Sequence, residues 1–161
     1  MIQVIEGNML DYDDVIIVQQ VNTLSVMGGG LSGQIMSRYP EVPIEYKKYI
    51  KKRMKKATST RELLGEVLLV DVYDGKIIAN IFGQNDVRTD HDDTNIRYTE
   101  YDALFEGLRT VKTLAERLNC TLALPTYLGC GLGNGDWVYV REEIENIFAD
   151  NTVAVRFFHY R

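Results

Sequence analysis

The most informative stretch of this sequence runs Val15-Ile16-Ile17-Val18-Gln19-Gln20-Val21-Asn22-Thr23-Leu24-Ser25-Val26-Met27-Gly28-Gly29-Gly30. Its first four residues are β-branched, which is typical of a central strand that is buried on both faces of a sheet. After the glycines, Leu31, Ile35 and Met36 recur at the spacing of one helix face. The stretch therefore predicts a buried strand, a glycine-rich loop (loop one, residues 22–30) and a helix.

A second segment repeats this context. A strand over 120–124 precedes Pro125-Thr126-Tyr127-Leu128-Gly129-Cys130-Gly131-Leu132-Gly133-Asn134-Gly135 (loop two, residues 125–135), and a helix over 137–148 follows. Glycine lets backbone N–H groups approach an anion, and a helix N-terminus adds positive potential. One such loop is equally explained by a tight turn between strand and helix. Two loops in matched positions favour a cradle for a diphosphate at the carboxyl ends of strands.

The remaining elements predict an α/β fold, a three-layer α/β/α sandwich with a mixed central sheet, formed by residues 1–161 as one domain. We expect strands over 2–5, 66–72, 76–82 and 152–158, and helices over 43–57 and from Thr99, which would cap its helix with Asp102 completing a capping box. Tyr73-Asp74-Gly75 is typical of a hairpin turn. Residues 83–97 are polar and predict a long surface loop.

Composition limits the class of protein. The chain has 161 residues, a net charge of −5 and 45% hydrophobic residues, as in ordinary globular domains. No apolar run approaches the roughly 20 residues of a membrane span, and the N-terminus lacks the layout of a signal peptide. Cys120 and Cys130, with no second Cys/His cluster, argue against a disulfide scaffold or a metal site. We expect a cytoplasmic protein without metal or cofactor.

One basic segment stands out, because residues 47–56 hold seven Lys or Arg and no acidic residue. It could contact the phosphate backbone of a nucleic acid. Its alternative explanation is an amphipathic helix, in which Tyr46, Tyr49, Ile50 and Met54 form the buried stripe and the lysines are solvated. No exposed aromatic residues are interleaved with the charges, and the chain is acidic overall, so we favour the second interpretation.

The two loops together resemble those of macrodomains, the ADP-ribose-binding modules. Asn22 precedes the triple glycine by six residues, and Gly-Cys-Gly-Leu-Gly-Asn-Gly-Asp-Trp at 129–137 resembles the family's phosphate loop. Ala79-Asn80-Ile81-Phe82-Gly83-Gln84 and Arg97-Tyr98-Thr99 resemble macrodomains of bacteria and their phages. The branch includes yeast-type ADP-ribose-1″-phosphate phosphatases, terminal ADP-ribose glycohydrolases and antitoxin macrodomains that remove ADP-ribose from DNA.

This resemblance implies roles for particular residues. Asn8 and Met9 occupy the place of the family's adenine-recognising Gly-Asp-apolar segment, with an amide instead of a carboxylate. Tyr160 or Phe158 would flank the adenine, although strand-end packing explains both equally well. The ligand-binding residues implied on the two loops are Gly28, Gly29, Gly30, Leu31, Gly129, Cys130, Gly131, Leu132, Gly133 and Asn134.

Catalytic roles are implied for Asn22, which would hold the distal ribose, and for Asp136, which would orient a water. Each has a structural alternative, a turn for Asn22 and a helix N-cap for Asp136. The lysine of the glycohydrolases is replaced by Gly83-Gln84, and glutamine forms no Schiff base. Cys130 has no paired histidine that would make it a nucleophile.

We therefore expect a hydrolase of an ADP-ribose derivative, with ADP-ribose-1″-phosphate phosphatase activity as the best fit. The alternatives are a non-catalytic ADP-ribose reader and a glycohydrolase acting on protein or nucleic acid. The sequence indicates no oligomeric state.

Overall fold

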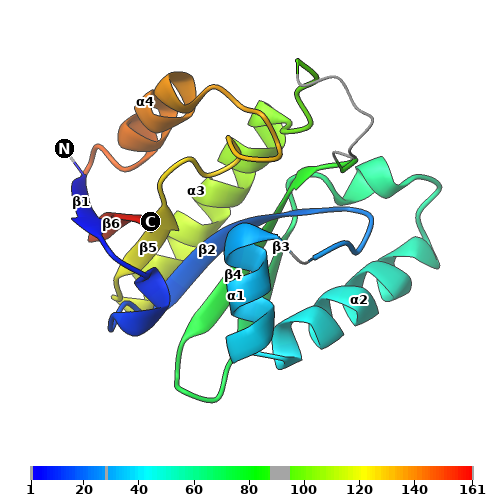
Figure 1. The fold of residues 1–161 in the computed structure, drawn as a ribbon, viewed down its shortest axis with the longest axis horizontal. Coiled ribbons are helices and arrows are strands. Elements are labelled where there is room, and N and C mark those ends of the chain that lie inside the picture. Colours follow the sequence, from blue (N-terminus) through cyan, green and yellow to red (C-terminus); the bar gives the residue numbers. More distant parts are fainter. Residues whose placement is uncertain (1, 28, 88–94, 161) are drawn as a thin grey trace.

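In the computed structural model, which describes residues 2–27, 29–87 and 95–160, a six-stranded sheet forms the middle layer (Figure 1). The strand order is β1-β6-β5-β2-β4-β3. Neighbouring strands are parallel, except that β3 runs antiparallel to β4. The mixed sheet is as predicted, with the strands β1 (Gln3–Glu6), β2 (Ile16–Asn22), β3 (Val67–Asp71), β4 (Ile77–Gln84), β5 (Leu122–Pro125) and β6 (Val155–His159).

Helices cover both faces of this sheet (Figure 1). They are α1 (Gly30–Arg38) and α2 (Glu41–Met54) on one face, and α3 (Tyr101–Leu118) and α4 (Trp137–Ile147) on the other. Two short 3-10 helices, η1 (Met9–Asp11) and η2 (Thr60–Leu63), complete the described elements. The predicted three-layer α/β/α architecture is confirmed. No helix in the described part of the chain is long and apolar enough to cross a membrane.

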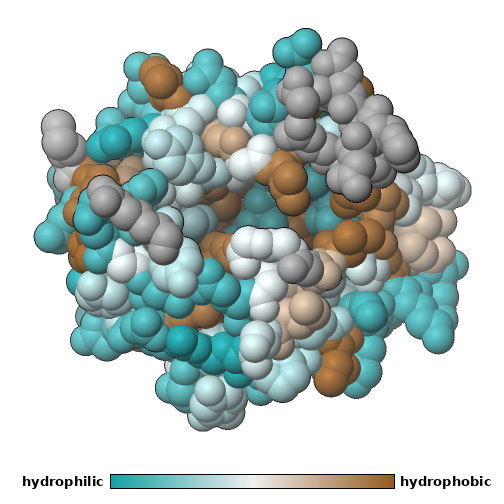
Figure 2. Space-filling model, in the orientation of Figure 1, coloured by the Kyte–Doolittle hydropathy of each residue, from teal (hydrophilic) through white to brown (hydrophobic). Residues whose placement is uncertain are grey.

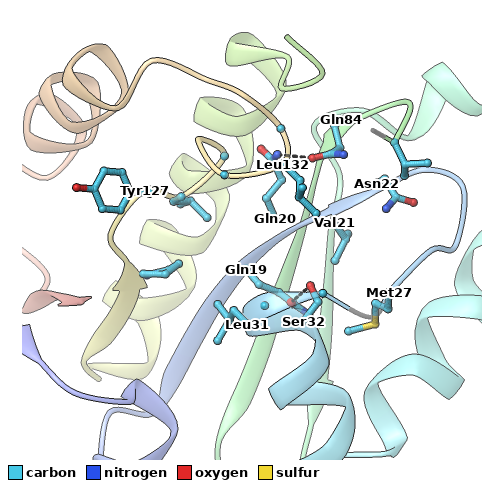
Figure 3. Close-up of a pocket in the computed structure, with 18 of the residues that line it drawn as sticks. Gln19, Gln20, Val21, Asn22, Met27, Leu31, Ser32, Gln84, Tyr127 and Leu132 are labelled. Carbon is cyan, nitrogen blue, oxygen red and sulfur yellow. Dashed lines mark hydrogen bonds between the residues drawn. The ribbon is translucent and has the colours of Figure 1, made fainter. Parts of the chain in front are cut away.

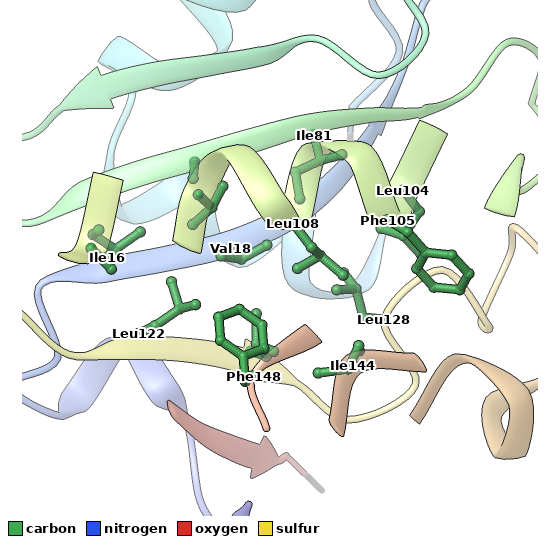
Figure 4. Close-up of a cluster of buried hydrophobic side chains, with 14 of the residues drawn as sticks. Ile16, Val18, Ile81, Leu104, Phe105, Leu108, Leu122, Leu128, Ile144 and Phe148 are labelled. Carbon is green, nitrogen blue, oxygen red and sulfur yellow. The ribbon is translucent and has the colours of Figure 1, made fainter. Parts of the chain in front are cut away.

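Strand β2 lies in the interior of the sheet, and its side chains are buried on both faces, as its β-branched run predicts. Ile16 and Val18 pack into the cluster under α3 and α4 (Figure 4). Ile17 packs into the cluster under α1 on the opposite face. Along the sheet, β2 pairs with β4 on one side and with β5 on the other. The carboxyl ends of these three parallel strands therefore lie together at one edge of the sheet.

Some boundaries differ from the sequence-based expectation. Strand β4 continues two residues beyond Phe82, because Asn22 at the end of β2 still pairs with Gln84. Thr99 does not cap α3: the helix begins at Tyr101 with Glu100 at the N-cap, and no side chain makes a capping bond. The capping prediction was wrong because Thr99 is buried and directs its hydroxyl elsewhere.

The basic segment lies mainly on α2 and the residues that follow it, and the helix is amphipathic. Tyr46 and Ile50 on its inner face are buried, whereas Lys47, Lys48, Lys51 and Lys52 on its outer face are exposed. Arg53 forms an ion pair with Glu66 at 2.6 Å. The buried stripe is the one that the spacing of apolar residues predicts.

Candidate functional site

A pocket of about 480 Å3 opens at the carboxyl ends of β2, β4 and β5 (Figure 3). Its floor is residues 19–22 of β2, with Gln84 at the end of β4. One wall is formed by residues 26–27 and 29–32 of loop one and α1. The opposite wall is formed by residues 125–129 and 131–133 of loop two. Figure 2 shows this hollow on the molecular surface, with apolar surface on its rim. The two glycine-rich loops thus meet across one cavity, as predicted.

On the loop-one wall, the N–H groups of Gly30 and Leu31 have no hydrogen-bond acceptor among the residues that the structure describes. Helix α1 begins at Gly30 with Gly29 at the N-cap, and no side chain caps it. Gly30 has a φ of +54°, a left-handed conformation that favours glycine. The first N–H groups of a helix have no partner within the helix, and they carry the positive end of its dipole. The N–H groups of Gly30 and Leu31 therefore give this wall affinity for an anion.

Loop two presents donors from the other side. Its internal bonds run from the N–H of Cys130, Asn134 and Gly135 to carbonyl groups at positions 127, 131 and 129. Among the described residues, the N–H groups of Gly131, Leu132 and Gly133 have no hydrogen-bond acceptor. Such a run of backbone N–H groups forms an anion-binding concavity.

The two loops approach each other closely. The Leu132 side chain lies 3.7 Å from the position that a Cβ atom on Gly29 would take, in ordinary van der Waals contact. Leu132 is nevertheless 63% exposed, and Figure 3 shows it between the two walls. A ligand between the loops would lie beneath this side chain.

The described lining of the pocket carries almost no ionisable group. It contains no Asp, Glu, His, Lys or Arg, and its only titratable side chain is Tyr127. Tyr127 has a φ of +62°, an uncommon conformation for a bulky residue. Among the described residues, no three His, Cys, Asp or Glu side chains converge to hold a metal ion. Backbone dipoles and amide side chains thus dominate the electrostatics of this lining.

Asn22 lines the pocket but is heavily engaged in loop one. Its Oδ1 accepts hydrogen bonds from the N–H of Leu24 at 3.0 Å and of Val26 at 3.2 Å. Its Nδ2 donates to the Val26 carbonyl at 2.8 Å. The turn-stabilising role is therefore present. An amide nitrogen carries a second hydrogen, and no described residue accepts it, so Asn22 can also donate one hydrogen bond to a ligand.

Sequence reasoning missed the buried polar floor of the pocket. Gln19 donates to Asn80 on β4 at 2.6 Å and accepts from the Ser32 hydroxyl of α1 at 3.0 Å. Gln19 is 2% exposed and Asn80 is fully buried. This chain of bonds fixes the start of α1 to the sheet. The signal was visible, because a polar residue inside an apolar central strand needs a buried partner.

The adenine-side residues lie outside this pocket. Met9 is buried, and Asn8 accepts from the Leu10 N–H and donates to Gln34 at 2.8 Å. A second depression, lined by residues 10, 30, 33, 34, 37 and 38, shares Gly30 with the first pocket. Tyr160 is 59% exposed and does not line the pocket, whereas Phe158 is buried against Tyr12.

Three further predicted residues, Asp136, Asn134 and Cys130, do not line the pocket. Asp136 is exposed and caps α4 by accepting from the Val138 N–H at 3.0 Å. This is the helix-capping role that the sequence offered as the alternative to catalysis. Asn134 donates to the Ile96 carbonyl at 3.1 Å. Burial, reinforced by the charge of Asp136, raises the pKa of the Cys130 thiol to about 12, so Cys130 is not an activated nucleophile. Gly28 lies outside the described residues.

These observations define a three-layer α/β/α domain with a backbone-lined pocket between two glycine loops at the ends of parallel strands. No protein-family model matches the sequence, and no curated protein sequence is significantly similar to it. Solved structures do match, and several of them are macrodomains. The chain has the macrodomain fold.

Three of these structures illustrate the likeness. A protein of unknown function from Bacteroides thetaiotaomicron is 21% identical, with a TM-score of 0.83 over 99% of this chain and 98% of that chain. The macrodomain of Mycobacterium tuberculosis DarG is 26% identical, with a TM-score of 0.75 over 99% and 97% of the two chains. Thermosipho africanus DarTG, solved in complex with ADP-ribose, is 20% identical, with a TM-score of 0.72 over 98% of this chain and 41% of that chain.

Proposed function

We propose that this protein binds ADP-ribose in the pocket between loop one and loop two. The observation that supports this most is the pair of facing donor sets, the N–H groups of Gly30 and Leu31 on one wall and those of residues 131–133 on the other. A diphosphate bridging two sugars satisfies both sets at once. The ADP-ribose complex of the similar Thermosipho africanus DarTG supports the same ligand.

Calorimetric titration with ADP-ribose tests this proposal, with adenosine and ribose 5-phosphate as ligands that lack the diphosphate. We expect saturable binding of ADP-ribose and much weaker binding of both fragments. Gly133→Ala should weaken binding, because the new Cβ would lie 2.2 Å from the Thr99 hydroxyl and displace loop two. Absence of any binding to ADP-ribose in the folded wild-type protein would overturn the proposal.

Gly107→Ala provides the matched control. A Cβ at Gly107 would lie 2.4 Å from the Ile81 side chain, a comparable clash at the contact between α3 and β4, where neither residue lines the pocket. We expect this variant to lose stability but to keep its affinity for ADP-ribose as long as it is folded. Equal loss of affinity in both variants would mean that stability, and not the loop, governs binding.

Hydrolysis of ADP-ribose-1″-phosphate is the second candidate function. The unpaired N–H groups and the remaining donor hydrogen of Asn22 could stabilise charge on a phosphate while a water attacks. The described lining offers no carboxylate, histidine or lysine as a general base, which supports non-catalytic binding over the hydrolysis that the sequence favoured. Release of phosphate from this substrate would identify a phosphatase, and release of ADP-ribose from modified protein or DNA would identify a glycohydrolase. A non-catalytic ADP-ribose reader would give neither product.

A further inference from the structure

We propose that Gln20 and Thr99, which no sequence motif singled out for the pocket, are positioning residues that hold loop two in its anion-binding conformation. This inference rests on the proposed function and names the residues that prepare its phosphate loop. Gln20 comes from β2 and Thr99 from the segment before α3, so the pair joins two parts of the chain that are far apart in sequence.

The direction of the hydrogen bonds in this pair is fixed by chemistry. The Thr99 hydroxyl lies 2.6 Å from the Gly129 carbonyl oxygen, which can only accept, so the hydroxyl hydrogen is donated there. Thr99 Oγ1 is then left to accept from Gln20 Nε2 at 2.9 Å. The second hydrogen of Nε2 goes to Gln84 Oε1 at 2.8 Å. One orientation of the Gln20 amide satisfies both of its bonds and leaves the Thr99 hydroxyl free to donate to Gly129.

Loop two is anchored at two carbonyl groups through this arrangement. The Gly129 carbonyl accepts from the Thr99 hydroxyl and from the Gly135 N–H at 2.9 Å. The Gly133 carbonyl accepts from the N–H groups of Tyr98 at 2.8 Å and Thr99 at 3.0 Å. The unpaired N–H groups of residues 131–133 lie between, or at, these two anchors. Their position in the pocket is therefore set by the contact with Thr99.

Three glycines pack closely against this pair, Gly83 on β4 and Gly129 and Gly133 on loop two. A Cβ atom would lie 2.2 Å from Gln20 Oε1 at Gly83, and 2.2 Å from Thr99 Oγ1 at Gly133. At Gly129, which has a φ of +74°, it would lie 3.1 Å from Gln20 Oε1. Loop two thus rests directly on the two polar side chains, and a Cβ atom at Gly133 would also meet the Gly129 carbonyl oxygen at 2.9 Å.

Gln20 Oε1 is buried and has no hydrogen-bond partner among the described residues. An unsatisfied buried acceptor costs stability, and such departures from full satisfaction concentrate at functional sites. The bonds that this amide does make lead through Thr99 to loop two and through Gln84 to β4.

Thr99→Val tests the proposal, because valine keeps the shape of threonine and removes the hydroxyl; Thr99→Ser restores the hydroxyl and serves as the rescue. In the apo protein we expect the Gly135 amide to exchange with solvent about tenfold faster in Thr99→Val than in wild type, the size expected for loss of one hydrogen bond. Thr99→Ser should exchange at nearly the wild-type rate. This measurement needs no ligand, so it decides the positioning role even if ADP-ribose does not bind. Unchanged exchange in Thr99→Val would overturn the proposal.

Ligand affinity supplies the second readout. We expect Thr99→Val and Gln20→Leu to bind ADP-ribose about tenfold more weakly, with the affinity for adenosine changed less than twofold. Thr99→Ser should recover most of the loss. Equal weakening of both ligands would identify a purely structural role and would overturn the proposal. No binding of ADP-ribose by wild type, together with faster Gly135 exchange in Thr99→Val, would overturn the proposed function but support the positioning of the loop.

Discussion

The hydroxyl of Tyr46, on the basic helix α2, is hydrogen-bonded to the backbone carbonyl oxygen of Asn22 and lies 3.0 Å from the Asn22 side-chain oxygen. Both residues are buried. The inner face of the basic helix therefore contacts a pocket residue through Tyr46 and supports the turn that begins loop one. Burial raises the pKa of Tyr46, so its hydroxyl remains protonated and remains a donor across the physiological range.

Tyr46→Phe should reduce both stability and affinity. The Asn22 carbonyl would lose a buried donor, which costs roughly 1–3 kcal/mol of unfolding free energy. The turn at residues 22–26 would become less well fixed, so affinity for ADP-ribose should fall as well. Denaturant unfolding and calorimetry measure the two effects, and Tyr49→Phe, which removes a hydroxyl bonded to Glu66 away from the pocket, is the control. Wild-type affinity in Tyr46→Phe would contradict this coupling.

Asn8→Asp should strengthen the binding of ADP-ribose. A carboxylate accepts a stronger hydrogen bond from an adenine amino group than an amide oxygen does, and it still caps η1 through the Leu10 N–H. It cannot donate to Gln34 as Asn8 does. Calorimetry with ADP-ribose and with adenosine checks the change, and Asn8→Ala should weaken both ligands. Unchanged or weaker binding by Asn8→Asp would remove Asn8 from the adenine site.

Asp136→Ala should lower the unfolding free energy by about 1 kcal/mol through loss of the α4 cap, whereas Asp136→Asn should not, because Asn caps helices as well as Asp does. Affinity for ADP-ribose should be unchanged in both variants. If the protein hydrolyses ADP-ribose-1″-phosphate, the comparison also tests the catalytic role that the sequence suggested. Loss of turnover in the stable Asp136→Asn variant would restore that role.

Cys130 should resist alkylation in the folded protein. With a pKa of about 12 against an ordinary value of 9.0, its thiolate is scarce at pH 8, and iodoacetamide should modify it more than about 100-fold more slowly than a free cysteine. Because the unfolded thiol ionises first, this group contributes stability below about pH 9 that is lost as the pH rises towards 12. Mass spectrometry of native and denatured protein measures the labelling, with Cys130→Ser as the blank. Rapid native labelling of Cys130 would contradict the assignment.

Neutralising the outer face of the basic segment should leave the pocket intact. Lys51, Lys52, Lys55 and Lys56 are exposed, so their joint replacement by Gln should change stability by less than about 0.5 kcal/mol per site and leave the affinity for free ADP-ribose unchanged. Titration with DNA at several salt concentrations tests the alternative of a nucleic-acid substrate. A steep salt dependence that the quadruple variant abolishes would favour that substrate.

Much of the fold could be predicted because it depends on local patterns. The β-branched run of β2, the hairpin between β3 and β4 and the stripe of α2 each contain their own signal, and the structure confirms all three. The position of the pocket followed from two strand–glycine–helix segments. Thr99 shows the limit of such reasoning: a threonine before a helix has the pattern of an N-cap, and only the tertiary contact with Gly129 gives it another role.

The candidate site was predicted less completely for the same reason. Asn22 and the loop glycines could be found from their sequence context, but Gln20 and Gln84 act through each other across two strands, and no spacing within either strand indicates that bond. For Asp136, the helix cap that its sequence context also predicted is present in the structure. Side chains whose roles arise from contacts between distant segments are the ones that a single sequence does not reveal.

The absence of charged side chains from the described lining also affects how this site can diverge. A pocket whose donors are peptide N–H groups is specified by the path of the main chain, so most substitutions in its loops alter the rim without removing a donor. What such a site tolerates least is bulk at Gly133, where a Cβ atom would meet the Thr99 hydroxyl at 2.2 Å and the Gly129 carbonyl oxygen at 2.9 Å. Recognition of this kind can outlast extensive change of sequence, provided that a few positions remain without a side chain.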